Sequence, residues 1–163
     1  MKILEFKTIV QEYSDFSELG NQQQNLLEKA IEARKKAYSP YSHFSVGAAV
    51  ELKDGTFVTG NNQENIAFPS GLCAERTVLF YANANHPGIP ILRMAISSAS
   101  ENVQVDYPVY PCGACRQVMA EYENISGHPI EIILMGATGK VHIVNGLINL
   151  MPLAFDNDNI KIN

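Results

Sequence analysis

The sequence predicts an α/β domain built around a mixed sheet of five strands. Short β-prone segments alternate with segments of helical period, and only a tight turn separates the first two β-prone segments. The chain has 163 residues, of which 46 % are hydrophobic and 18 % are charged. This length and balance suit one globular domain with a proper core and leave little room for a second.

The segment before the first strand is expected to contain a polar extension and then a helix. Residues 1–24 are polar and end in Gly-Asn-Gln-Gln-Gln, which is typical of a loop. We therefore expect an N-terminal extension packed on the domain. Residues 25–37 repeat apolar side chains with the helical period, and Pro40 ends this amphipathic helix. Residues 25–163 then form the single domain.

The strands and the later helices follow from β-prone runs, turn signals and apolar periodicity. Strands are expected at residues 44–52, 57–61, 91–98, 130–135 and 141–144. Helices are expected at residues 73–84, from residue 112 or 113 through 122, and in a short turn at 146–150. Asp54 and Gly55 mark the tight turn of a β-hairpin between the first two strands. The tail after Pro152 is expected to be extended.

Charge and composition weigh against several classes of partner. The net charge is −5 and the pI is about 5.3, so the basic footprint of a nucleic-acid-binding protein is missing. No apolar run reaches the roughly 18 residues of a membrane span, and residues 1–10 lack the apolar core of a signal peptide. Three cysteines cannot form a closed set of disulfides. We expect a reducing compartment, and thus the cytoplasm.

The three cysteines, Cys73, Cys112 and Cys115, all lie at expected helix starts. Cys112 and Cys115 form a C-x-x-C pair, which taken alone also fits a redox dithiol or half of a structural zinc site. Glu75 follows the first cysteine by two residues. Three thiolates with a spare carboxylate favour a Zn²⁺ site that keeps its fourth position open.

A closed structural zinc site is the alternative, and it would need a histidine as fourth ligand. None of the four histidines has ligand spacing to a cysteine; they are His43, His86, His128 and His142.

The charge of such a site makes two arginines relevant. Three thiolates on Zn²⁺ leave a net charge of −1, so nearby positive groups are needed if the metal is to activate water. Arg76 and Arg116 each adjoin a ligand segment and can donate to thiolate sulfur, and helix N-termini add positive potential. The alternative for both arginines is a solvated helix surface.

Glu75 can act at the metal only under one geometric condition. Residues two apart do not share a face of a regular helix, so Glu75 reaches the metal-bound water only if Cys73 lies at the start of the helix. Otherwise Glu75 is a first-turn glutamate that suits the helix dipole.

These residues carry a resemblance to a known family. Cys73-Ala74-Glu75-Arg76 together with residues 111–117, Pro-Cys-Gly-Ala-Cys-Arg-Gln, resembles the zinc signature of the small homotetrameric cytidine deaminases. Residues 41–49 resemble the family's first strand, and residues 62–65 resemble its ribose-binding stretch. The resemblance extends from about residue 37 to 155 and implies a three-layer α/β/α catalytic domain within residues 25–163.

The resemblance implies an activity and a catalytic centre. Cys73, Cys112 and Cys115 would hold one Zn²⁺ per chain, with water in the fourth place. Glu75 would move protons between that water and the cytosine ring. Cytidine and 2′-deoxycytidine would yield uridine and 2′-deoxyuridine plus ammonia, a reaction of pyrimidine salvage.

Substrate contacts are also implied by the resemblance. Phe44 would pack against the base, and the backbone at Ala74 would read the edge of the base. Asn62 and Glu64 would bind the ribose hydroxyls. Phe155 would enter the site of a neighbouring subunit in a homotetramer. The alternatives are core packing for Phe44, a turn for Asn62, a solvated charge for Glu64 and a tail anchor for Phe155.

Two other functions stay open from the sequence. A deaminase of a blasticidin-type nucleoside antibiotic shares the three-cysteine signature, although Phe44, Asn62 and Glu64 favour a simple nucleoside. A non-catalytic, zinc-stabilised binding module is the second alternative, and a Glu75→Gln variant discriminates between it and an enzyme. Asn61, Gln63 and Phe68 depart from residues common in the family, which leaves the preference between ribose and deoxyribose undecided.

Overall fold

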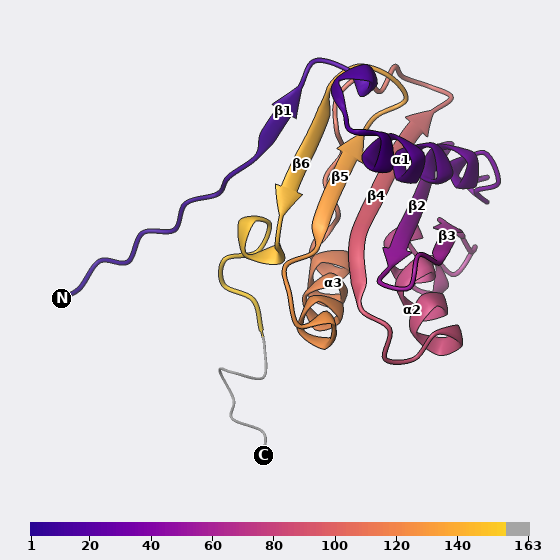
Figure 1. Cartoon of the computed structure of the whole chain (residues 1–163). Helices are drawn as coiled ribbons and strands as arrows, with labels where there is room; N and C mark the ends of the chain where they lie inside the picture. Colours follow the sequence, from indigo (N-terminus) through magenta and orange to yellow (C-terminus); the bar gives the residue numbers. More distant parts are fainter. Residues whose placement is uncertain (156–163) are drawn as a thin grey trace.

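The computed structural model describes residues 1–155 and contains one mixed sheet with helices on both faces (Figure 1). The strands are β1 (Gln11–Tyr13), β2 (Phe44–Leu52), β3 (Phe57–Asn61), β4 (Ile91–Ser100), β5 (Glu131–Met135) and β6 (Val141–Asn145). The α-helices are α1 (Asn21–Arg34), α2 (Ala74–Asn85) and α3 (Gly113–Ser126). The strand order is β1-β6-β5-β4-β2-β3, and among these strands of residues 1–155 only β4 and β5 pair in parallel.

Successive side chains of each strand point to opposite faces of the sheet, so the core has two sides in a three-layer sandwich. One side, under α1, contains Leu26, Leu27, Ala30, Ala49, Ala95 and Ile133. The other side, under α2 and α3, contains Val50, Val78, Leu79, Met94, Met119 and Ile132. Figure 1 shows α1 on one face of the sheet and α2 with α3 on the opposite face. The expected α/β/α layering is therefore present.

The expected number of five strands was wrong, because β1 adds a sixth strand at the edge of the sheet. Residues 11–13 pair antiparallel with β6, and Glu12 stands opposite His142. The strand is three residues long and largely exposed, so it carries no apolar alternation that a sequence pattern could reveal. Pairing with the edge of β6 creates this strand.

The first helix begins earlier than expected. Residues 21–24 are the first turn of α1 and not a loop, and the backbone N–H of Gly20 donates to Gln23 Oε1 at 3.0 Å. This contact satisfies a group that would otherwise be unpaired at the helix start. The helix ends at Arg34 and not at residue 37. The expected boundary between residues 24 and 25 thus lies inside α1.

The other expected elements are confirmed with small shifts. The hairpin of β2 and β3 has the expected bounds, and β4 continues to Ser100, two residues further than expected. A 3-10 helix at Leu147–Asn149 occupies the expected short turn. The expected extended tail lies mostly in residues 156–163, outside the described residues. Within residues 1–155, no helix has the length and apolar character needed to cross a membrane.

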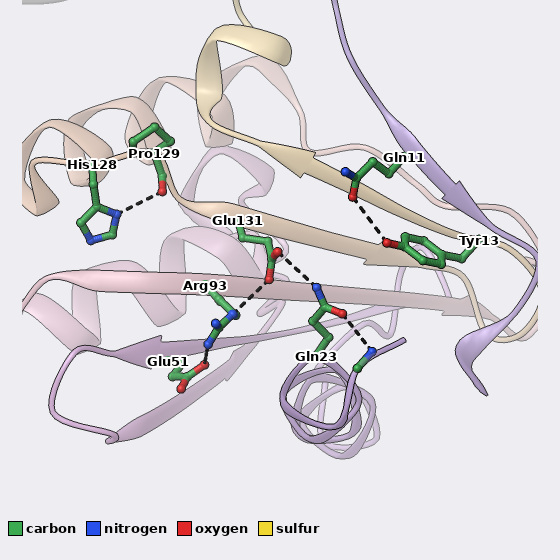
Figure 2. A network of polar contacts seen from close by, with 9 residues as sticks. Gln11, Tyr13, Gln23, Glu51, Arg93, His128, Pro129 and Glu131 are labelled. Carbon is green, nitrogen blue, oxygen red and sulfur yellow. Dashed lines mark hydrogen bonds and ion pairs between the residues drawn. The ribbon is translucent and has the colours of Figure 1, made fainter. Parts of the chain in front are cut away.

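An ion-pair ladder crosses three strands on one side of the sheet (Figure 2). Glu51 and Glu131 stand opposite Arg93 on its two neighbouring strands. Arg93 donates to Glu51 at 2.6 Å and to Glu131 at 3.1 Å. Gln23 of α1 donates to the second oxygen of Glu131 at 3.2 Å, which ties this helix to the sheet (Figure 2).

Gly47 allows α1 to lie directly against β2. A Cβ built at this buried position would overlap the carbonyl oxygen of Ala30 and the backbone nitrogen of Arg34, neither of which can rotate away. We expect Gly47→Ala to lower the free energy of unfolding by about 3 kcal/mol or more. Denaturant unfolding measures this change. Gly20→Ala is the control, since its Cβ meets only the flexible Gln23 side chain at 3.4 Å, and equal midpoints for the two variants would contradict the prediction.

Candidate metal centre and active site

Three cysteine sulfurs converge where two helices begin. Cys73 is the N-cap of α2, Cys112 is the N-cap of α3, and Cys115 lies in the first turn of α3. The three sulfur atoms lie within 4.8 Å of one another, and those of Cys112 and Cys115 are 3.4 Å apart. Zn–S bonds of about 2.3 Å in a tetrahedral site place sulfurs about 3.8 Å apart. The cluster therefore fits Zn²⁺.

The composition of the cluster leaves room for a fourth ligand. Among residues 1–155, the only group of three or more potential metal ligands consists of these cysteines, without a histidine. A closed site completed by histidine is thus not formed by the described residues. A redox pair of Cys112 and Cys115 would leave the placement of Cys73 beside them unexplained.

The cysteines already favour a thiolate in the protein alone. The hydrogen bond from Cys115, aided by Arg76, lowers the pKa of Cys73 to about 5, despite the opposing effect of burial. The same contact with Cys73, together with burial, raises the pKa of Cys115. The Cys73 thiolate is therefore a ready metal ligand near neutral pH. Cys115 must lose its proton when a metal binds.

Glu75 meets the condition that its spacing imposed. Cys73 has an extended backbone at the helix start (φ −71°, ψ 153°), so the helical separation of faces does not apply between Cys73 and Glu75. Glu75 is only 5 % exposed. Burial, followed by the neighbouring Cys73, raises the pKa of its carboxyl. A carboxyl held closer to neutrality beside a metal is suited to carry protons.

Two adjoining cavities open beside the cluster. The smaller, of about 310 Å³, is lined by both Cys73 and Glu75 together with residues of β2, β4 and the loop before α3. The larger, of about 480 Å³, is lined by the loops around residues 41–42 and 62–73 and by Arg76. Four residues line both cavities: Ser42, Asn62, Glu64 and Cys73. The two hollows are therefore parts of one site large enough for a small molecule.

Phe44 and Asn62, two of the substrate contacts that the resemblance implies, both line the smaller cavity. The side chain of Asn62 accepts from the N–H of Val46 at 2.7 Å and donates to the carbonyl of Phe44 at 2.9 Å. Asn62 therefore holds β2 in place as well as facing the cavity. One N–H of its amide is left for a ligand.

Glu64 also faces both cavities. One of its carboxylate oxygens accepts from the N–H groups of Tyr41 and Ser42, at 2.8 and 3.3 Å. The hydrogen bond with Ser42 lowers the pKa of Glu64, so the carboxylate is ionised near neutral pH. The other oxygen remains available to accept hydroxyl groups of a ligand.

Two of the expected contact residues lie elsewhere. Ala74 is fully buried as the first residue of α2 and is not part of either cavity lining. Its N–H is among the first-turn donors that the helix itself leaves unpaired. Phe155 is 67 % exposed and lines neither cavity, while its carbonyl accepts from Gln117 at 2.7 Å.

The two arginines differ in what they contact. Arg76 Nη2 donates to the sulfur of Cys73 at 3.8 Å, which supplies positive charge to the cluster. Arg116 donates to the carbonyls of Pro111 and Leu150, at 2.8 and 2.7 Å. Arg116 thus ties the segment before Cys112 to the C-terminal segment, and its hydrogen bonds within the described residues do not reach a sulfur.

Six residues of the smaller cavity were not expected from the sequence: Ser42, Val46, Ile96, Ser98, Val109 and Tyr110. Ile96 and Ser98 share one face of β4 by strand alternation, so the expected strand placed them together but did not show which face meets the site. Ser98 Oγ is buried without a hydrogen-bond partner among residues 1–155. Val109 and Tyr110 belong to an irregular loop, which carries no periodic signal.

A match to a protein family agrees with the zinc site that the geometry indicates. Residues 20–127 match the family described as the cytidine and deoxycytidylate deaminase zinc-binding region. This match and the three-cysteine cluster together establish a zinc site with one Zn²⁺ per chain.

Individual relatives give a narrower assignment. The cytidine deaminase of Sporosarcina psychrophila is 37 % identical over 139 residues, covering 85 % of this chain and 94 % of the relative. That of Halalkalibacterium halodurans is 46 % identical over 98 residues, covering 60 % and 70 %. The chain therefore belongs to the cytidine deaminase family.

Solved structures agree in fold. A cytidine deaminase structure from Burkholderia pseudomallei has a TM-score of 0.70 at 37 % identity, covering 84 % of this chain and all of that chain. One from Mycobacterium tuberculosis has a TM-score of 0.62 at 32 % identity, covering 81 % and 95 %.

Proposed function

We propose that this chain is a zinc-dependent hydrolase that converts cytidine and 2′-deoxycytidine to uridine and 2′-deoxyuridine plus ammonia. One observation carries the proposal: a buried glutamate and a cysteine of the metal cluster line the same cavity as Phe44, Asn62 and Glu64. Proton transfer, metal binding and nucleoside recognition would then take place within a single hollow of about 310 Å³. The reaction would serve pyrimidine salvage in the cytoplasm.

In this proposal Glu75 moves the protons. Bound Zn²⁺ supplies Lewis-acid activation of a water molecule. The Glu75 carboxylate takes a proton from that water and passes it to N3 of the cytosine ring. The water oxygen bonds to C4. Glu75 then takes the second proton from that oxygen and delivers it to the exocyclic amine, which leaves as ammonia when the C4–N bond breaks and the C4 carbonyl forms. Cys73, Cys112 and Cys115 hold the metal, and Arg76 offsets the negative charge of the thiolates.

The remaining residues orient the nucleoside. Phe44 gives the base an aromatic surface, and the free N–H at the start of α2, around Ala74, reads the edge of the base. Asn62 donates its remaining amide N–H to a ribose hydroxyl, and Glu64 accepts from ribose hydroxyls with the oxygen that its backbone contacts leave free. Arg116 acts on the metal indirectly, by fixing the segment that carries Cys112.

The active form is proposed to be a homotetramer, in which Phe155 enters the site of a neighbouring subunit. The exposure of Phe155 and its absence from the cavities of its own chain support this role. Residues 1–24 are proposed as an extension of one catalytic domain at residues 25–163, joined to it through β1 and the first turn of α1.

Turnover of three compounds side by side tests the proposal. Zinc-loaded protein is incubated with cytidine, 2′-deoxycytidine and blasticidin S, and ultraviolet absorbance and released ammonia are followed together. We expect rapid deamination of the two nucleosides. Faster turnover of blasticidin S would indicate an antibiotic deaminase, and no turnover of any compound would indicate a binding module.

The role of Glu64 leads to a prediction about KM. Glu64→Gln keeps an acceptor for Tyr41 and Ser42 but loses the charge of the carboxylate. A charge-assisted hydrogen bond contributes about 1.5–3 kcal/mol, so we expect KM for cytidine to rise about tenfold or more with a smaller change in kcat. Glu28→Gln, on α1 away from both cavities, is the control. An unchanged KM would contradict ribose binding by Glu64.

A further inference from the structure

A chain of hydrogen bonds runs from the N-terminal segment to the wall of the active site. His142 of β6 lies in the middle of the chain and is 3 % exposed. Its Nε2 is 2.9 Å from Glu12 Oε2, and its Nδ1 is 2.6 Å from the hydroxyl of Tyr110. Tyr110 lines the cavity that contains Glu75. The chain therefore joins β1, β6 and the loop before α3.

The chemistry of the three groups fixes the direction of these hydrogen bonds. Hydrogen bonds from Lys140 and then His142 lower the pKa of Glu12, so its carboxylate is ionised near neutral pH and only accepts. Nε2 of His142 must then carry a proton, and in the tautomer whose only ring proton is on Nε2 the Nδ1 atom accepts. The Tyr110 hydroxyl donates to that nitrogen. Each acceptor is thus matched to one donor.

The surroundings of His142 hold the chain in one arrangement. The ring of Tyr107 meets the imidazole edge to face at a centroid distance of 5.0 Å, and the Tyr110 ring lies 5.8 Å away. Glu12 stands directly opposite His142 in the pairing of β1 with β6, so strand register sets the position of the carboxylate. The imidazole is therefore confined by two rings and two hydrogen bonds.

The segment that carries Tyr110 has an irregular backbone. Residues 101–112 connect β4 to α3 without forming a helix or a strand. Within this segment, Tyr110 is followed by Pro111 and then by Cys112 of the metal cluster. A displacement of Tyr110 would change both the cavity wall and the approach to Cys112.

We propose that Glu12, acting through His142, is a positioning residue that fixes Tyr110 as part of the substrate-binding wall. The N-terminal segment then contributes to nucleoside binding without touching the nucleoside. This inference rests on the proposed deaminase function for its kinetic consequences, and on the structure alone for the placement of the wall.

Four variants separate positioning from simple stabilisation. Glu12→Ala removes the acceptor of His142, whereas Glu12→Gln keeps an oxygen that accepts. Tyr110→Phe removes only the hydroxyl at the other end of the chain. Lys140→Ala is the matched control, because Lys140 contacts the other oxygen of Glu12 in an exposed ion pair at 2.6 Å.

We expect Glu12→Ala and Tyr110→Phe each to raise KM for cytidine about five- to tenfold, the effect of losing one positioning hydrogen bond. The double variant Glu12→Ala/Tyr110→Phe should resemble the single variants, because both changes break the same series of hydrogen bonds. Glu12→Gln and Lys140→Ala should stay within about twofold of the unaltered protein. A lower melting temperature in Glu12→Ala with unchanged KM and kcat would show that these hydrogen bonds only stabilise the fold, and it would overturn the proposal.

Amide hydrogen exchange gives a readout that does not depend on activity. Peptides covering residues 101–111 should exchange faster in Glu12→Ala and Tyr110→Phe than in Lys140→Ala or the unaltered protein. Equal exchange in all four proteins would refute the positioning of the wall. If the unaltered protein does not deaminate cytidine, the proposed function fails, while exchange still decides the placement of Tyr110.

Discussion

Glu75→Gln is expected to remove nearly all turnover while leaving zinc and fold in place. Glutamine fills the same buried position beside Cys73, but it cannot take a proton from water or deliver one to the ring. General acid and base catalysis contributes about 10²- to 10⁴-fold, and Glu75 serves in several proton transfers, so we expect a loss at or above the upper end of this range. Steady-state kinetics and zinc content, measured on the same sample, check both parts.

Stability offers a second sign of the role of Glu75. Burial raises the pKa of its carboxyl, so ionising Glu75 costs the folded protein free energy once the pH rises above the pKa of the unfolded chain. Glutamine carries no such cost, and we expect the melting temperature of Glu75→Gln at pH 7 to equal or exceed that of the unaltered protein. Glu121→Gln, on the exposed face of α3, is the control. Retained turnover in Glu75→Gln would contradict the mechanism.

Cys115→Ala is expected to lose the metal and much of the stability. Cys115 is fully buried between the start of α2 and the first turn of α3, so its thiolate joins the two helices through the metal. Because metal binding couples to folding, we expect less than about one tenth of a zinc per chain and a loss of about 3 kcal/mol or more in the free energy of unfolding. Elemental analysis and thermal unfolding measure these two quantities.

A chelator provides the matched comparison for Cys115→Ala. It should lower the melting temperature of the unaltered protein toward that of the variant and leave the variant unchanged. One zinc per chain in purified Cys115→Ala would contradict the assigned ligand set. A chelator effect of equal size on both proteins would show that the stabilising metal lies elsewhere.

The metal centre was predictable because its chemistry is concentrated in few residues. Three cysteines at expected helix starts and a nearby glutamate favour a zinc site even before their distances are known. The sequence could only state the condition that Cys73 lies at the start of a helix. The structure meets that condition, because Cys73 is the extended N-cap of α2. Cys112 is the extended N-cap of α3 in the same way.

Other features could not be predicted because they depend on tertiary pairing. Glu12 has no pattern that marks a strand, and only the edge of β6 opposite His142 makes β1. Tyr110 reaches the cavity through a loop without periodicity. Asn62 was expected either to bind the ribose hydroxyls or to form a turn. Its amide also makes hydrogen bonds to the backbone of Val46 and Phe44, which are 16 and 18 positions away in the sequence.

Activity as a function of added zinc tests the account most directly. Metal-free protein, prepared with a chelator and then freed of it, receives Zn²⁺ in steps while cytidine turnover and ammonia release are recorded. Turnover should rise in proportion to zinc and level off at one Zn²⁺ per chain, as the Cys73, Cys112 and Cys115 cluster requires. Full turnover by the metal-free protein, or a requirement for a second zinc, would contradict the single metal centre and the roles assigned around it.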